Sequence, residues 1–200
     1  MVLIAVAALA AGMIYGLSGA QIGPISYLTE HSDYILYVLM FSVGISIGLN
    51  KAVFQNIKKY HIKICIIPFG IVAGTLIGGL LCSLLMGQPP GESLVIVSGL
   101  GWYSLSGILV TQVVSAQAGT VAFLSSLMRE ILSFLSIPWV SRRFNYYTAI
   151  APAAATSEDT TLPMLIRHTN EEVVVMAVFN GVICSALVPV LIRFFGDLFF

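Results

Sequence analysis

The chain has 200 residues, of which 58% are hydrophobic and only 9% are charged, and its formal net charge is zero. Ordinary soluble domains are roughly 25% charged, so a soluble fold of this chain would lack the polar residues needed to cover its surface. The composition therefore predicts an integral membrane protein. The sequence has no basic cluster interleaved with aromatic residues, which excludes a nucleic-acid-binding protein.

Several apolar runs are long enough to cross a bilayer. We expect spanning helices at residues 2–19, 34–49, 64–86, 120–140 and 173–195. The first run has the small apolar residues of a signal peptide but no basic residue before it, so we interpret it as a retained membrane helix. The loop after the second run carries four lysines, and the positive-inside rule places this loop in the cytoplasm. These are Lys51, Lys58, Lys59 and Lys63.

Small and polar residues inside the apolar runs have ordinary structural interpretations. Gly70, Gly74 and Gly78 recur at four-residue spacing, which predicts a tight contact between this helix and another. The cysteines lie in apolar segments without a metal-binding spacing, so we interpret them as small core residues. The histidines are expected in solvated loops. The residues concerned are Cys65, Cys82, Cys184, His31, His61 and His168.

Residues 93–114 contain the run SGLGWYSLSG at 98–107, with three glycines and three serines. Because each glycine inside a helix costs up to about 1 kcal/mol, this run predicts a broken or re-entrant helix. The number of membrane crossings also favours a re-entrant segment. Arg142 and Arg143 follow the helix at 120–140, and the positive-inside rule places them in the cytoplasm. They would lie outside if residues 93–114 crossed the membrane fully.

Residues 146–167 form the second irregular segment, with Glu158 and Asp159 between Pro152 and Pro163. A charge at membrane depth survives only where it faces water, a partner or a substrate, and irregular backbone there must be buried in protein or line a cavity. We therefore predict a second re-entrant hairpin that forms half of a binding site. A solvated loop between two helices is the alternative.

The predicted fold is an all-α integral membrane protein, with residues 1–200 in a single transporter domain. It has about five spanning helices plus two opposed re-entrant or broken-helix hairpins, with the N-terminus inside and the C-terminus outside. Hairpins that meet from opposite faces are one form of the broken helices from which transporters build sites near the midplane.

The acidic residues inside the apolar segments are the first candidates for chemistry. Glu130 lies in an apolar helix, where it is either a cation or proton site or one half of a structural ion pair. Arg129 points about 100° away around the helix and so faces other neighbours. Asp159 has the analogous position in the second hairpin, while the role of Glu158 is left open.

Hydroxyl and aromatic side chains surround both breaks. Trp102 and Tyr103 are either interface anchors or a cation-π cover for the substrate. Asn180 either ties two helices together or touches the substrate. The hydroxyl candidates are Ser104, Ser106, Thr156, Ser157, Thr160 and Thr161. Acids suit an ammonium group, and amides at half-helix N-termini suit a carboxylate, so the combination favours an amino acid with a basic side chain.

These residues resemble the bacterial LysO lysine exporter family over roughly residues 33–195. The similar stretches are GWYSLSGIL at 101–109, Arg129-Glu130, Thr156-Ser157, Asp159, TLP at 161–163 and LVPVLI at 187–192. The resemblance implies an exporter of L-lysine in the bacterial inner membrane that is multi-pass and proton-driven, needs no cofactor or metal, and is not an enzyme. The family's intramembrane acids fall on Glu130 and Asp159.

Full-length members are similar to this chain preceded by about three more helices, so the resemblance implies the C-terminal part of a split transporter. A second copy of the chain or a short separate membrane subunit would complete it. The alternatives are a sodium-coupled transporter of another small cationic or zwitterionic solute, and a non-transporting assembly subunit. An intramembrane hydrolase would need a carboxylate pair sharing a proton or a His-Glu metal motif, and the sequence has neither a His-x-x-x-His nor a second intramembrane aspartate.

Overall fold

The computed structural model describes residues 63–200 continuously and, before them, only residues 11, 12, 14–18, 23, 24, 27, 38, 41 and 45. The chain divides into two compact units, Met1–Lys51 and Ala52–Phe200. Everything below concerns the second unit. The predicted helices at 2–19 and 34–49, the lysine-rich loop before residue 63, His31 and His61 lie outside the described residues, apart from isolated helical positions.

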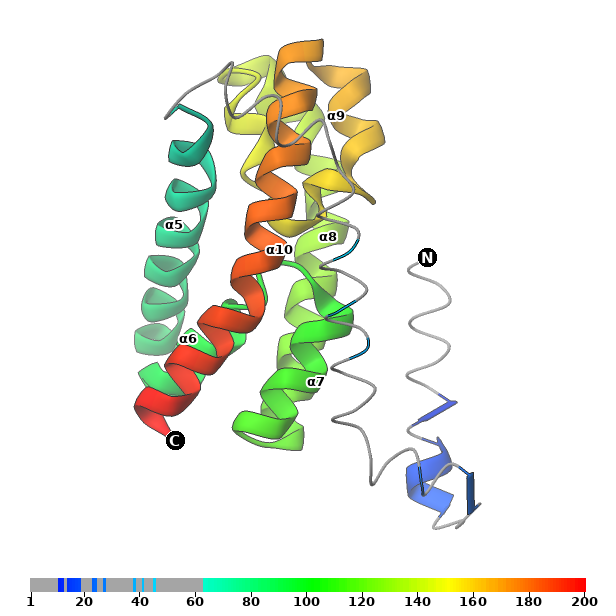
Figure 1. Ribbon diagram of the computed structural model, residues 1–200. Coiled ribbons are helices and arrows are strands. Elements are labelled where there is room, and N and C mark those ends of the chain that lie inside the picture. Colours follow the sequence, from blue (N-terminus) through cyan, green and yellow to red (C-terminus); the bar gives the residue numbers. More distant parts are fainter. Residues whose placement is uncertain are drawn as a thin grey trace. The chain divides into compact units, whose positions relative to one another are not determined.

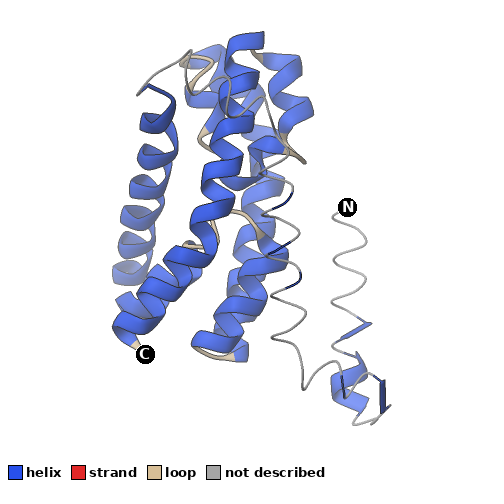
Figure 2. Ribbon diagram, viewed as in Figure 1, coloured by secondary structure: helices blue, strands red, loops and turns tan. Residues whose placement is uncertain are grey.

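Every described element is helical (Figure 2), which confirms the predicted all-α class. The elements are α5 (Lys63–Met86), α6 (Pro90–Val97), α7 (Tyr103–Val113), α8 (Ala116–Arg143), η1 (Thr148–Ile150), η2 (Ala154–Glu158), α9 (Leu162–His168) and α10 (Glu171–Phe199).

Three of these helices are long and apolar enough to cross a membrane. They cover Ile66–Met86, Ala116–Arg143 and Glu171–Phe199, with 21, 28 and 29 residues. The sequence predicted all three, although α8 and α10 extend beyond the expected ends. In Figure 1 they run the length of the unit, with α6 and α7 in its lower half and the segment that contains α9 in its upper half.

The first irregular segment is a helical hairpin, as predicted. α6 and α7 both lie in the half of the unit that contains the C-terminus, and they meet near its middle (Figure 1). The break between them holds Leu100 at φ 47° and Gly101 at φ 94°. Left-handed backbone at two consecutive residues ends α6 and turns the chain back. Tyr103 then starts α7 and packs edge-on against Phe123 of α8, with ring centroids 5.6 Å apart.

The second irregular segment comes from the opposite end. The chain leaves α8, descends through η1 and η2 to the middle of the unit, and returns through α9 to the start of α10 (Figure 1). Ala154 has φ 49°, and Pro163 stands in the first turn of α9, where a missing amide hydrogen costs nothing. The two hairpins are thus opposed, as the sequence predicts.

The two breaks touch each other through their backbones. The Ala155 amide donates to the Leu100 carbonyl at 3.1 Å. Gly101 lies beside the second break as well, because a Cβ there would be 3.7 Å from the Ala153 carbonyl oxygen. The hairpins therefore meet through a direct backbone contact, and the positive φ of Gly101 favours glycine there.

Three details of the sequence interpretation are wrong. Cys184 is buried as predicted, but Cys82 is exposed because its side of α5 has no neighbour among the described residues. His168 is the last residue of α9 rather than part of a loop. Within residues 63–200, the tight helix contact of α5 falls on Gly79, where a Cβ would collide with Val97, whereas a Cβ at Gly70, Gly74 or Gly78 would meet no described atom within 4 Å.

The second hairpin packs on α10 at a glycine. A Cβ at Gly181 would lie 2.6 Å from the backbone nitrogen of Glu158, and backbone cannot move aside as a flexible side chain can. We expect Gly181→Ala to destabilise the protein by about 1–3 kcal/mol through overpacking. Thermal unfolding of the purified protein in detergent measures this.

The matched control is Gly78→Ala, also inside a long helix, where the new methyl group meets nothing within 4 Å. Because alanine favours helix by up to about 1 kcal/mol over glycine, we expect its melting temperature to be unchanged or slightly raised. Equal melting temperatures for the two variants would contradict the close approach at Gly181.

Candidate functional site

Glu130 lies near the middle of α8 with only 1% of its surface exposed. Neither of its carboxylate oxygens has a hydrogen-bond partner among the described residues. Thr160 lies near this carboxylate, and Asp159 is within electrostatic range of it. The structural ion pair that the sequence left open is therefore not formed in this part of the chain.

An ionised carboxylate that is buried without a partner is costly by several kcal/mol. Such a group must be neutralised by a proton or by a cation. Glu130 is thus suited to hold a proton or an ammonium group, and residues 63–200 supply no basic side chain that pairs with it.

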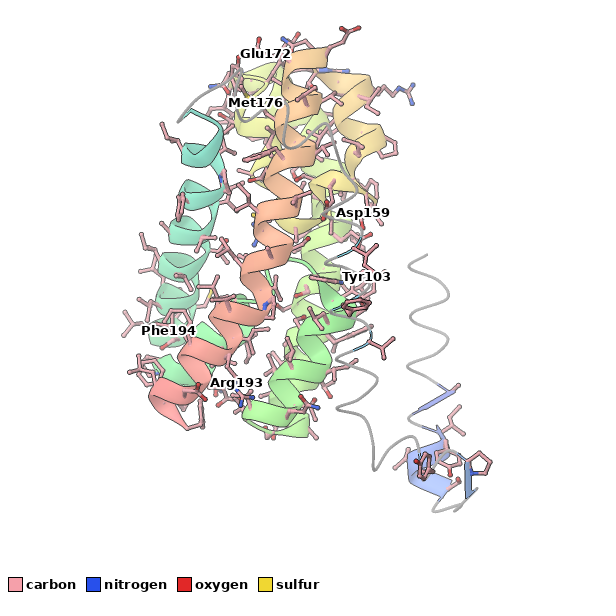
Figure 3. The ribbon with its side chains drawn as sticks, in the orientation of Figure 1. Tyr103, Asp159, Glu172, Met176, Arg193 and Phe194 are labelled. Carbon is pink, nitrogen blue, oxygen red and sulfur yellow. The ribbon has the colours of Figure 1, made fainter. Side chains whose placement is uncertain are left out.

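Asp159 is the exposed member of the acidic cluster. One of its carboxylate oxygens accepts hydrogen bonds from the amide and the hydroxyl of Thr160, the latter at 3.3 Å. Tyr103 lies within electrostatic range of both Glu130 and Asp159, and Figure 3 shows Tyr103 and Asp159 on the same side of the unit. The structure thus brings residues of the first hairpin, α8 and the second hairpin together, as predicted.

The other hydroxyl candidates serve the fold. Ser106 bonds to Ser126 of α8 at 3.3 Å. Thr156 and Thr161 bond to each other at 3.3 Å and to backbone carbonyls of their own hairpin. Ser104 is exposed and Trp102 is partly buried at the start of α7. Of the predicted hydroxyls, only Thr160 lies beside the acids.

Asn180 and Ser157 fasten the second hairpin to α10. The Asn180 amide donates to the Ala154 carbonyl and to the Ser157 hydroxyl, both at 3.0 Å. Ser157 in turn donates to the Ala177 carbonyl at 2.7 Å. All of these groups are buried. Of the two alternatives for Asn180, the observed contacts are those of a tie between elements.

Glu158 points away from its neighbour Asp159 and toward α10. It is partly buried, and its carboxylate accepts a hydrogen bond from Ser185 at 2.8 Å. Sequence reasoning left Glu158 without a role and missed Ser185. The sequence does contain a hint of this contact. Ser185 follows Gly181 by four residues, and residues at that spacing lie one above the other on the same face of a helix.

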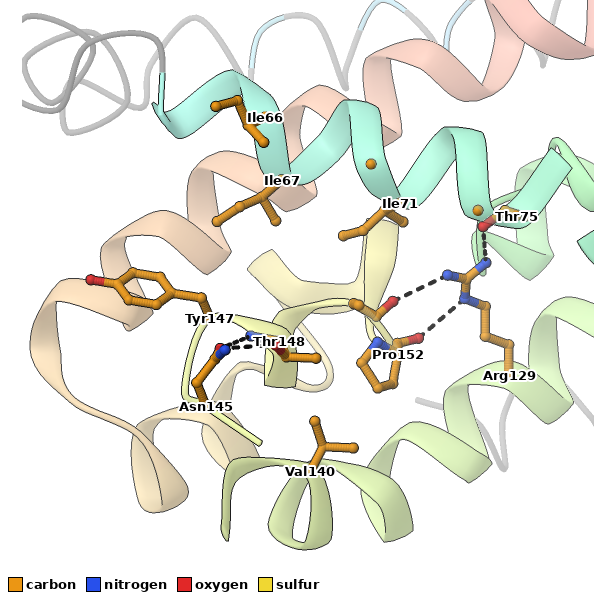
Figure 4. Close-up of a pocket in the computed structure, with 13 residues that line it drawn as sticks. Ile66, Ile67, Ile71, Thr75, Arg129, Val140, Asn145, Tyr147, Thr148 and Pro152 are labelled. Carbon is orange, nitrogen blue, oxygen red and sulfur yellow. Dashed lines mark hydrogen bonds between the residues drawn. The ribbon is translucent and has the colours of Figure 1, made fainter. Parts of the chain in front are cut away.

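Arg129 points to a different side of α8 from Glu130, as the angle of about 100° between consecutive helical residues predicts. Its guanidinium donates to the carbonyls of Pro152 and Ala151 at 3.1 and 3.2 Å and to the Thr75 hydroxyl at 3.1 Å (Figure 4). It therefore joins α8 to α5 and to the first half of the second hairpin. No described carboxylate lies within 4 Å of it, since the one ion pair found there joins Arg193 and Asp197.

Within the described residues, no group of three or more His, Cys, Asp or Glu side chains is arranged to hold a metal ion. The candidate site is instead the cluster of Glu130, Asp159, Thr160 and Tyr103, because it contains the buried acid without a described partner and the groups nearest to it. Assigning these residues to substrate binding stays a prediction.

A model of the lysine exporter LysO family matches residues 6–196. The chain belongs to this family. The resemblance inferred from the motifs is thereby confirmed.

Two curated relatives show the same membership. The chain is 39% identical over 185 residues to lysine exporter LysO of Escherichia coli K12, and the match covers 92% of this chain and 60% of that protein. It is 33% identical over 166 residues to a putative lysine exporter of Haemophilus influenzae Rd, covering 82% of this chain and 83% of that protein. No solved structure matches the chain.

In this member of the LysO family, we expect Asn180 to stabilise the fold rather than to bind the substrate. Replacing it with leucine keeps the branched shape of the side chain but leaves the Ala154 carbonyl without that donor, at a cost of about 1–3 kcal/mol. Thermal unfolding of Asn180→Leu measures the loss. The matched control is Thr120→Val, which removes an exposed bond to Ala116. If Asn180 touched substrate instead, the leucine variant would melt like wild type and only its lysine binding would change.

Proposed function

We propose that this chain exports L-lysine across the bacterial inner membrane, as a multi-pass protein, in exchange for protons. The observation that carries the proposal is the buried Glu130 carboxylate, neither oxygen of which is hydrogen-bonded to a described residue, beside the exposed Asp159. Membership of a family named for lysine export supports the substrate. The same residues use no cofactor, and the proton gradient supplies the energy.

Competition between lysine and protons for the same acids provides the coupling. A carboxylate in water-poor surroundings is neutralised either by the substrate ammonium or by a proton, and one excludes the other. Lysine from the cytoplasm binds the ionised acids through its ammonium groups. Protons from outside then neutralise the acids and release the lysine, and the protons leave on the cytoplasmic side.

Tyr103, Trp102 and Thr160 shape this site. Tyr103 lies near both acids, so its ring is placed to cover a bound ammonium by a cation-π contact. Trp102, the residue before α7, stands next to it along the chain. Thr160 orients Asp159 through its amide and hydroxyl. These residues position the substrate, and the acids carry the charge exchange.

A partner completes the transporter in this proposal. The chain spans 60% of the length of the E. coli relative. The expected partner is a second copy of this chain or a short separate membrane subunit. A sodium-coupled carrier of another small cationic or zwitterionic solute is the competing proposal, and a non-transporting assembly subunit is another. The experiment below separates them.

We expect inverted membrane vesicles containing the chain to take up radiolabelled lysine when a pH gradient is imposed. Glu130→Gln and Asp159→Asn should each reduce this uptake by about tenfold or more, because a charge-assisted hydrogen bond contributes about 1.5–3 kcal/mol. The matched control is Glu171→Gln, which alters an exposed glutamate in the first turn of α10 and should transport like wild type.

Each other outcome has a defined meaning. Uptake that follows a sodium gradient instead of a pH gradient would favour the sodium-coupled carrier. Uptake by Glu130→Gln at the wild-type rate would rule out the acid-based exchange. If the acid variants and wild type all support transport only when a partner subunit is present, and do so equally, the chain is an assembly subunit.

A further inference from the structure

Arg129 carries a charge that the described residues do not neutralise. Its three hydrogen-bond acceptors, two backbone carbonyls and the Thr75 hydroxyl, are all uncharged. A guanidinium has five N–H donors, so two remain after these three bonds. Arg129 is also only partly buried. A charged group at membrane depth persists where it meets water, a partner or a substrate.

The guanidinium lies at the edge of a cleft of about 690 Å³ (Figure 4). One wall is α5 from Ile66 to Thr75, and the other is the chain from Asn145 to Pro152. A second cleft of about 490 Å³ reaches Arg129 from the α8 side, past Ser133 and Ser136. Among the described residues, Arg129 is the one with a charged side chain that lines either cleft.

The first cleft leads inward from the end of the unit that holds Arg142 and Arg143. Asn145 and Tyr147 line it just beyond α8, and Arg129 lies 14 residues back along that helix, or about 21 Å. The positive-inside rule places the Arg142 end in the cytoplasm. The cleft therefore connects the cytoplasmic end of the unit with a cation near the middle of the helix.

Most of the backbone amides that the sequence suggested as carboxylate ligands at the second break are already engaged. The amides of Ala155, Thr156, Asp159 and Thr161 donate to protein carbonyls, and the Thr160 amide donates to Asp159. At the first break, the amides of Trp102 and Tyr103 also have acceptors. Arg129 differs from every backbone amide of the breaks because it offers spare donors together with a full positive charge.

We propose that Arg129 is the carboxylate-binding residue of this protein: an amino acid enters the cleft from the cytoplasmic end, and its α-carboxylate binds the free donors of the guanidinium. This inference rests on the proposed function and deepens it. Arginine binds carboxylates through a planar fork of N–H donors. Because Arg129 lines the cleft, a carboxylate in the cleft can reach the guanidinium. The ammonium groups go to the acids on the next face of α8.

The consequence is selectivity for amino acids over amines. A diamine has the ammonium groups that the acids bind but nothing to neutralise Arg129, whereas lysine satisfies both. Lysinamide is the sharpest probe, because it differs from lysine only in a neutral carboxamide in place of the carboxylate.

The test compares binding of lysine and lysinamide to the purified protein by competition with radiolabelled lysine. We expect wild type to bind lysine about tenfold or more tightly than lysinamide, as a charge-assisted pair requires. Arg129→Gln should remove this preference while leaving lysinamide affinity near the wild-type value. Arg129→Lys should retain part of it. The matched control, Thr75→Val, removes one bond to Arg129 but no charge and should keep the preference.

The wild-type protein alone can overturn the inference, even if the Arg129 variants fail to fold. If wild type binds lysine and lysinamide with equal affinity, no group in the site binds the substrate carboxylate. A folded Arg129→Gln with the wild-type preference means that Arg129 is only a tie between α8, α5 and the hairpin. Both results leave lysine export standing, whereas absence of any lysine binding or uptake removes the proposed function and this inference together.

Discussion

The structure depends on one backbone hydrogen bond, from the amide of Ala155 to the carbonyl of Leu100 at 3.1 Å. Inside a bilayer an unsatisfied backbone group costs several kcal/mol, so two broken helices are tolerable only if each satisfies the other. Leu100 and Ala154 both adopt positive φ, which costs a residue with a side chain roughly 1–2 kcal/mol. Arg129 completes the arrangement by donating to two more carbonyls of the second hairpin.

α8 separates opposite charges by their position around one helix. Arg129 and Glu130 are consecutive, so their side chains leave the helix about 100° apart. One meets Thr75 and the hairpin carbonyls, and the other meets Thr160 and Asp159. Because their partners lie on different sides of α8, the two side chains make no ion pair with each other.

The sequence predicts those parts of the structure that depend on local patterns. Long apolar runs predicted α5, α8 and α10, and glycines and prolines inside apolar runs predicted both breaks. The ties between elements were not predictable, because they join residues far apart in the chain: Asn180 to Ala154, Ser185 to Glu158, and Arg129 to Thr75, which is 54 residues away. A hydroxyl has the same sequence signature whether it binds a carbonyl, an acid or a substrate.

The glycines of α5 show why such a pattern needs its surroundings. Gly70, Gly74 and Gly78 have the spacing of a helix-helix contact, yet a Cβ at each would meet none of the described atoms within 4 Å. Gly70 and Gly74 instead line the cleft that ends at Arg129. Because these two residues have no side chains to project from α5, the cleft is wider there. Small residues at this spacing can allow two helices to pack closely, but in α5 they widen the cleft that leads to Arg129. The spacing of the glycines alone does not distinguish these two roles; the position of Arg129 in the structure does.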